Sequence, residues 1–112
     1  MKYLLHQAIP EFAKEVPDKD AFRIDDQGVT YRELEDASNR LAHWLREKGV
    51  KKGDRVGLFL TKSLELPIAI YGVLKAGAAY VPIDPSIPVK RVQFIIEDCG
   101  IKLLISLSLI HI

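Results

Sequence analysis

Apolar and polar residues follow two different periods along the chain, and these periods predict its helices and strands. Apolar residues three and four positions apart, as on one face of a helix, recur in segments 2–15, 30–49, 64–75 and 88–99. Short apolar or alternating runs predict strands at 22–25, near Val29, and at 55–60, 79–83 and 102–106. From residue 55 onward the order is strand, helix, strand, helix, strand. Short connections between such apolar strands favour parallel strands joined by right-handed crossovers.

The predicted fold class is therefore α/β: a β-α-β-α-β parallel-sheet unit preceded by an N-terminal helix, a short hairpin and a capped helix. In the first helix, Pro10 is expected to bend or split the helix. Ser63 is expected to cap the N-terminus of the helix over 64–75, because a serine hydroxyl can accept a hydrogen bond from a free backbone N–H.

The helix over 30–49 has the clearest end signals. Thr30 and Glu33 have the spacing of a capping box, and Val29 and Leu34 lie where a hydrophobic staple would place them. Gly49 follows the last apolar position, where a left-handed residue commonly ends a helix. These signals predict a helix fixed at both ends.

Length, composition and charge narrow the class of protein. The 112 residues allow one domain at most, and 16 Lys and Arg against 15 Asp and Glu argue against a nucleic-acid-binding protein. The longest uncharged runs, 66–74 and 103–112, fall short of the roughly 20 residues that a membrane-spanning helix needs. A single cysteine, Cys99, excludes an internal disulfide and predicts a cytoplasmic location.

Asp84 is the carboxylate best placed for a functional site. It directly follows a predicted buried strand, and ligands of open α/β sheets bind at the carboxyl ends of strands. The alternative is that Asp84 caps the proline-rich turn that continues with Pro85, and the turn chemistry of aspartate favours this structural interpretation.

The other candidates for chemistry have structural interpretations. Segment 72–77 has the glycine spacing of a phosphate loop, but Ala78 and Ala79 follow it instead of Lys and Ser or Thr, and its glycines are predicted to close a helix. The three histidines are scattered, and Cys99 has no partner at metal-ligand spacing. Cys99 is expected to be a small buried apolar residue, and no metal site is predicted.

Two longer stretches resemble a known family. Residues 29–60, VTYRELEDASNRLAHWLREKGVKKGDRVGLFL, are similar to the opening of the AMP-forming adenylating enzymes, and residues 74–85, LKAGAAYVPIDP, resemble a signature of the same family. That superfamily includes acyl-CoA synthetases, the adenylation domains of nonribosomal peptide synthetases, and luciferase. The second stretch is most like the amino-acid-adenylating branch. The likeness continues through residues 87–106, with Arg91 and the segments EDCG and KLLIS.

The resemblance implies an enzyme that activates a carboxylate with ATP and Mg²⁺ to an acyl-adenylate. It then passes the acyl group to the thiol of CoA or of a carrier-protein phosphopantetheine. It also implies that the family's phosphate loop, acyl pocket and C-terminal catalytic lysine follow beyond this chain. Residues 1–106 are thus expected to be a partial N-terminal region, inactive alone and without catalytic, cofactor-binding or metal residues. Only Asp84 and Pro85 carry over, as residues near the entrance for the thiol acceptor.

The last six residues, 107–112, depart from the family pattern. Their sequence, LSLIHI, also reads as the translation of a common transposon-type sequencing adaptor. They are expected to be a non-native tail produced by truncation of the gene.

Two other functions remain open from the residues alone. The chain would also suit a small standalone, non-enzymatic α/β binding or interaction module, which should be soluble and unfold cooperatively. A flavodoxin-like or receiver-like domain would need a ligand site at a switch in strand order, and the sequence has neither its phosphate loop nor its acidic cluster.

Overall fold

The computed structural model describes residues 8–60 and 63–106, and within these ranges every predicted helix and strand is present in the predicted order. Where a range was predicted, the observed ends within the described residues differ by at most two positions. The elements are α1 (Ala8–Glu15), β1 (Asp20–Ile24), β2 (Gln27–Thr30), α2 (Tyr31–Glu47), β3 (Arg55–Phe59), α3 (Glu65–Lys75), β4 (Ala79–Pro82), α4 (Val89–Cys99) and β5 (Ile101–Ser106). The predicted start of the first helix and the tail 107–112 lie outside the described residues.

The strands form two separate sheets. β1 and β2 pair as an antiparallel hairpin. β3 lies at the centre of a three-stranded sheet in the order β4-β3-β5, and it pairs in parallel with both neighbours. The predicted parallel β-α-β-α-β unit is therefore confirmed.

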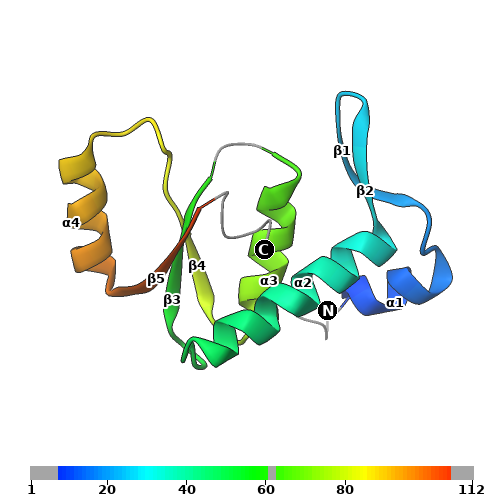
Figure 1. Cartoon of the computed structure of the whole chain (residues 1–112), viewed down its shortest axis with the longest axis horizontal. Coiled ribbons are helices and arrows are strands. Elements are labelled where there is room, and N and C mark those ends of the chain that lie inside the picture. Colours follow the sequence, from blue (N-terminus) through cyan, green and yellow to red (C-terminus); the bar gives the residue numbers. More distant parts are fainter. Residues whose placement is uncertain (1–7, 61–62, 107–112) are drawn as a thin grey trace.

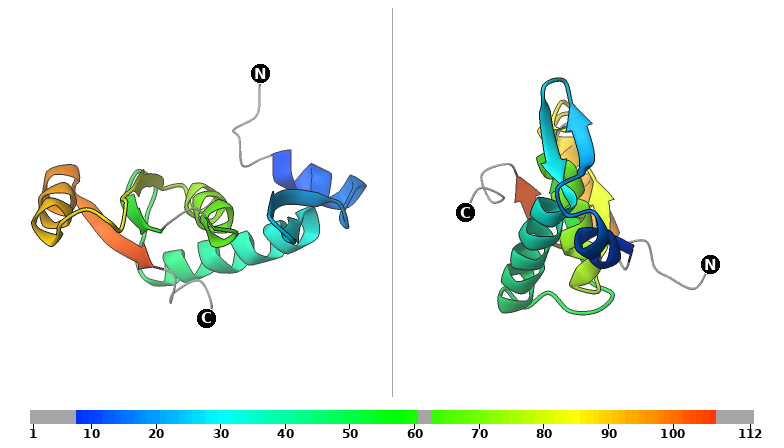
Figure 2. Two further views of the ribbon diagram at one scale, coloured as in Figure 1. Left: turned by 90° about the horizontal axis from the view of Figure 1, so that it is seen from above. Right: turned by 90° about the vertical axis from the view of Figure 1, so that its right-hand side faces the viewer.

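The helices cover the parallel sheet unevenly. Figure 1 shows α3, with α2 beyond it, on one side of the sheet, and α4 on the opposite side. α2 extends from beside the parallel sheet to the hairpin, and Figure 2 shows α1 and the hairpin gathered at its N-terminal end, far from α4. The main core lies between the sheet, α3 and the C-terminal half of α2. Its most enclosed side chains include Leu45, Val56, Leu58, Val73 and Ile105.

The ends of α2 are built as the sequence predicts. The Thr30 hydroxyl accepts a hydrogen bond from the Glu33 backbone N–H at 3.1 Å, and the Thr30 N–H donates to the Glu33 carboxylate at 2.9 Å. Val29 and Leu34 pack together in a second buried cluster with Tyr71 of α3. At the other end Gly49 adopts a φ of +90°, which closes the helix in a left-handed cap.

One prediction about a helix start is wrong and another is not tested. α1 is continuous from Ala8 to Glu15, and the bend or split expected at Pro10 stays a prediction, because the segment before Ala8 lies outside the described residues. Ser63 does not cap α3, because Leu64 is the residue at the cap position and no side chain bonds there. The Ser63 hydroxyl is instead enclosed without a hydrogen-bond partner among the described residues.

Candidate functional site

The carboxyl edge of the parallel sheet is where a ligand site is expected. β3, β4 and β5 run in the same direction, so their C-terminal ends at Phe59, Pro82 and Ser106 share one edge. β4 and β5 lie on opposite sides of β3, and α3 and α4 lie on opposite faces of the sheet (Figure 1). Such a switch in strand order opens a crevice at this edge in α/β folds, and Asp84 follows it directly.

The structure places Asp84 in a turn. Its carboxylate accepts a hydrogen bond from the Ser86 backbone N–H at 2.9 Å, and its backbone carbonyl accepts from the Ile87 N–H at 3.2 Å. The Ser86 backbone N–H, followed by the Ser86 side chain, holds the pKa of the exposed Asp84 carboxyl below its usual value. Ile83, which is 2% exposed, anchors the start of the loop, and Pro85 is half-buried.

This geometry explains Asp84 by turn chemistry. Its carboxylate bonds with the loop that carries it, and a carboxylate whose pKa is lowered is a poorer proton acceptor near neutral pH. The structural interpretation of Asp84 therefore has direct support in the described residues.

The glycine segment 72–77 ends α3 rather than beginning a helix, as the sequence predicts. Gly72 faces α2 so closely that a Cβ atom there would lie 2.7 Å from Leu41 Cδ2. Gly77 has a φ of +83°, its N–H donates to the Leu74 carbonyl, and the next N–H donates to the Val73 carbonyl. This Schellman motif uses up the backbone N–H groups that a phosphate loop would direct at its ligand.

The described residues do not form a complete site for ATP and Mg²⁺, which the family resemblance implies. Those residues contain no group of three or more His, Cys, Asp or Glu side chains that could hold a metal ion. Neither the glycine segment nor the turn at Asp84 offers an array of free donors for a triphosphate. We therefore derive no chemical step through ATP or Mg²⁺ from these residues.

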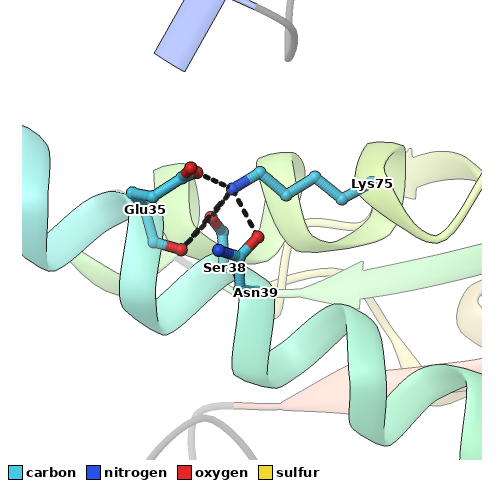
Figure 3. A network of polar contacts seen from close by, with 4 residues as sticks. All are labelled: Glu35, Ser38, Asn39 and Lys75. Atoms are coloured by element: carbon cyan, nitrogen blue, oxygen red, sulfur yellow. Dashed lines mark hydrogen bonds and ion pairs between the residues drawn. The ribbon is translucent and has the colours of Figure 1, made fainter. Parts of the chain in front are cut away.

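A polar cluster between α2 and α3 was missed by the sequence analysis. The ammonium of Lys75, at the C-terminal end of α3, bonds to the Glu35 carboxylate, to the Ser38 hydroxyl at 2.7 Å and to the Asn39 side-chain oxygen at 2.9 Å (Figure 3). The Lys75 side chain is 10% exposed and Ser38 is fully buried. Because an ammonium has three donors, this cluster saturates it, and Lys75 is a structural tie rather than a nucleophile or base.

One signal could have revealed the cluster. α3 is apolar nearly all round and carries only two charged residues, Glu65 and Lys75, while Ser38 lies in the apolar stripe of α2. A lone lysine on a buried helix and a lone serine on a buried face need partners, since an unpaired buried polar group is costly.

Of the other groups named by the sequence analysis, His6 and His111 lie outside the described residues, and His43 and Cys99 lie on different helices, α2 and α4. His43 is exposed on α2 and pairs with Glu47 one turn later at 2.8 Å. A hollow of about 430 Å³ on the same surface is lined, within the described residues, by α2 alone, so groups from different elements do not converge there. Cys99 is half-buried, rather than fully buried as expected, and no other residue of α4 is fully buried either.

The described residues contain no helix that combines the length and apolar character needed to cross a membrane.

Comparison with known proteins gives the family. The model of the family described as "AMP-binding enzyme" matches residues 9–111. Bacitracin synthase 1 of Bacillus licheniformis is 45% identical over 102 residues, which cover 91% of this chain and 2% of the relative. Surfactin synthase subunit 1 of Bacillus subtilis is 46% identical over 101 residues, with 90% and 3% covered. The chain thus spans only a few per cent of the length of these relatives.

Solved structures agree with the sequence match. The nonribosomal peptide synthetase FmoA3, in a form bound to α-methyl-L-serine-AMP, superposes with a TM-score of 0.86 at 37% identity, over 91% of this chain and 12% of that one. The N-terminal subdomain of NpsA from Klebsiella oxytoca gives 0.80 at 29% identity, over 89% and 26%. The chain therefore belongs to the AMP-binding enzyme family, as a segment related to the adenylation domains of nonribosomal peptide synthetases.

Proposed function

We propose that this chain is the N-terminal part of a domain that adenylates an amino acid and delivers it to a carrier protein. The observation that carries the proposal is 45% identity over 102 residues to Bacitracin synthase 1, of which those residues are only 2%. Two titles among the structural neighbours support the substrate and the acceptor. FmoA3 was solved with an aminoacyl-adenylate, and NpsA was fused to a PCP in an adenylation di-domain.

The whole domain would join an amino-acid carboxylate to the AMP part of ATP, with Mg²⁺, and release pyrophosphate. The aminoacyl group would then pass to a phosphopantetheine thiol and release AMP, with CoA as the alternative acceptor. In this proposal the chain supplies scaffold, and alone it is inactive because the phosphate loop and the catalytic lysine belong to other parts of the domain. The engagement of Lys75 and Asp84 in structural hydrogen bonds supports this division.

An exchange assay with a chimera tests the proposal. The 102 matched residues replace their counterparts in an adenylation domain of Bacitracin synthase 1, and ATP–pyrophosphate exchange is measured with that domain's amino acid. We expect the chimera to catalyse ATP–pyrophosphate exchange within about tenfold of the rate of the parent domain, since the replaced segment contains none of the reacting groups. We expect no such activity from the chain alone. Exchange by the chain alone, or a folded chimera without exchange, would contradict the proposal.

We also propose that the loop containing Asp84 and Pro85 borders the entrance for the thiol acceptor. Support comes from the family resemblance and from the position of the loop at the carboxyl edge of the sheet. In the chimera, Asp84→Ala should leave exchange unchanged and slow aminoacyl transfer to the carrier protein. Asp26→Ala, in the exposed hairpin turn, is the control. Equal transfer rates in both variants would remove Asp84 from this role.

We also propose a cellular location for the chain and an assignment of its two segments. A cytoplasmic location is supported by the single cysteine. The assignment of residues 1–106 to a partial AMP-binding region and of 107–112 to a non-native tail is tested by sequencing the source DNA beyond codon 106. A frame that continues into a Ser/Thr/Gly-rich loop would support the assignment, and a native stop codon after Ile112 would contradict it.

A further inference from the structure

The outward face of α4 carries an exposed phenylalanine between four charges. Phe94 is 56% exposed. At about 100° per residue it lies opposite the apolar stripe that α4 turns toward the sheet, so its ring faces outward. Lys90, Arg91, Glu97 and Asp98 surround it, and all four are exposed. The Arg91 guanidinium lies 5.8 Å from the centre of the Phe94 ring. Within the described residues none of the four charges forms an ion pair.

The order of these charges along α4 opposes the helix dipole. The first turn contains the two basic residues and no acidic one, and the last turn contains the two acidic residues and no basic one. Acidic groups stabilise the N-terminal end of a helix and basic groups the C-terminal end. The arrangement on α4 therefore destabilises the isolated helix, and a local choice of this kind is typical of residues that act outside their own helix.

The same arrangement is complementary to itself in antiparallel orientation. Lys90 and Glu97 are seven residues apart and lie on one flank of Phe94, while Arg91 and Asp98 lie on the other. A two-fold axis that passes between the Phe94 rings of two copies would stack these rings. It would also place Lys90 of each copy beside Glu97 of the other copy, and Arg91 of each copy beside Asp98 of the other.

We propose that α4 is a self-association surface, through which two copies of this chain pair with their α4 helices antiparallel about Phe94. Figure 1 shows α4 at one end of the molecule, where a second copy can approach it. The net charge of +1 adds little repulsion between copies. A helix of 11 residues is about 16 Å long, so the contact lies below the roughly 1,200 Å² of standard interfaces. The association should therefore be weak, with a Kd on the order of 0.1–1 mM. The proposal is independent of the adenylation function.

Charge exchange tests the proposal with the whole 112-residue chain, by sedimentation equilibrium in 50 mM and in 500 mM salt. Lys90→Glu/Arg91→Glu and Glu97→Lys/Asp98→Lys should each weaken self-association at least about tenfold, because like charges then meet. An equimolar mixture of the two variants should associate again, and so should the chain that carries all four changes. High salt should weaken the wild-type pairing.

The matched control is Lys51→Glu/Lys52→Glu, which alters two exposed lysines away from α4 and changes the net charge from +1 to −3, as Lys90→Glu/Arg91→Glu does. It should leave the association unchanged. A chain that stays monomeric at millimolar concentration overturns the proposal. So does association that survives both reversals, or a mixture that fails to associate when circular dichroism shows both variants folded; the last two would assign any association to other surfaces.

Discussion

Lys75 shows how one side chain can join two helices that pack mainly through apolar residues. Its ammonium reaches from the last turn of α3 to three side chains of α2, and only 10% of the Lys75 side chain remains exposed. An enclosed charge of this kind stabilises a fold only while all its partners are present. Its partners therefore depend on it as much as it depends on them.

Lys75→Met keeps the length of the side chain and removes the charge. We expect it to lower the free energy of unfolding by about 2–3 kcal/mol, because Glu35 and Ser38 lose their partner in a largely enclosed place. Urea denaturation measures the change. The control is Lys102→Met, which removes a half-exposed ammonium bonded to Asp54 and to the Gly49 carbonyl and should cost less than about 1 kcal/mol. Equal losses for the two variants would contradict the structural role of the cluster.

Asp54 makes folding depend on pH at the acid end. The Lys51 backbone N–H, 2.8 Å away, and secondly the Lys102 side chain hold the pKa of Asp54 below its usual 3.8. A carboxyl whose pKa is lower in the folded state stabilises the fold above its unfolded pKa, and the contribution disappears as the pH falls through the folded value. Asp54→Asn should therefore lower Tm at pH 7, and the difference from wild type should shrink as the pH falls below 3.8.

Thermal unfolding across this pH range checks the prediction for Asp54. Asp26→Asn, which removes the same charge from an exposed hairpin turn, controls for the change in net charge. A difference between Asp54→Asn and wild type that stays constant down to pH 2 would contradict it.

At Gly72 the backbone of α3 lies against the Leu41 side chain of α2. A Cβ atom there would lie 2.7 Å from Leu41 Cδ2 and 2.9 Å from its Cγ. Gly72→Ala should gain about 1 kcal/mol of helix propensity and lose about 1–3 kcal/mol to overpacking, for a net loss near 1 kcal/mol. In a Leu41→Ala background most of the opposing atoms are gone, so Gly72→Ala should become neutral or stabilising. A double-mutant cycle by urea denaturation measures this coupling, and additive effects would contradict it.

Which features the sequence could predict follows from how local their causes are. The capping box at Thr30 and the left-handed Gly49 depend on neighbours within a few positions, so pattern alone located them. The tie at Lys75 joins residues 36 to 40 positions apart, and no local pattern pairs them. The predicted cap at Ser63 is wrong by one position, because α3 begins at Glu65 with Leu64 at the cap position.

The same division holds for the candidate site. The position of Asp84 after a strand was readable from the run of apolar residues, and its bond to Ser86 follows from the known turn chemistry of aspartate. The location of that turn at a switch in strand order required the pairing β4-β3-β5, which depends on contacts between distant segments.

Across the whole molecule, burial is concentrated on one side of the sheet. α2 has five buried residues, among them Leu34, Leu41 and Leu45, whereas α4 has none. Val89 and Phe94 of α4 are 72% and 56% exposed. Helices with few buried side chains open at low free energy, while helices within the core open only with the whole fold.

Hydrogen exchange should therefore separate the two helices. In a dilute solution of the chain, where pairing through α4 is negligible, we expect amides of α4 to exchange at least about tenfold faster than those in the middle of α2. The measurement is mass spectrometry of peptides covering 89–99 and 31–47. In the chimera with Bacitracin synthase 1, added protein that covers the half-buried stripe of α4 should slow exchange there and leave α2 unchanged. Equal protection of the two helices in the chain alone would mean that α4 is held by more than its visible packing.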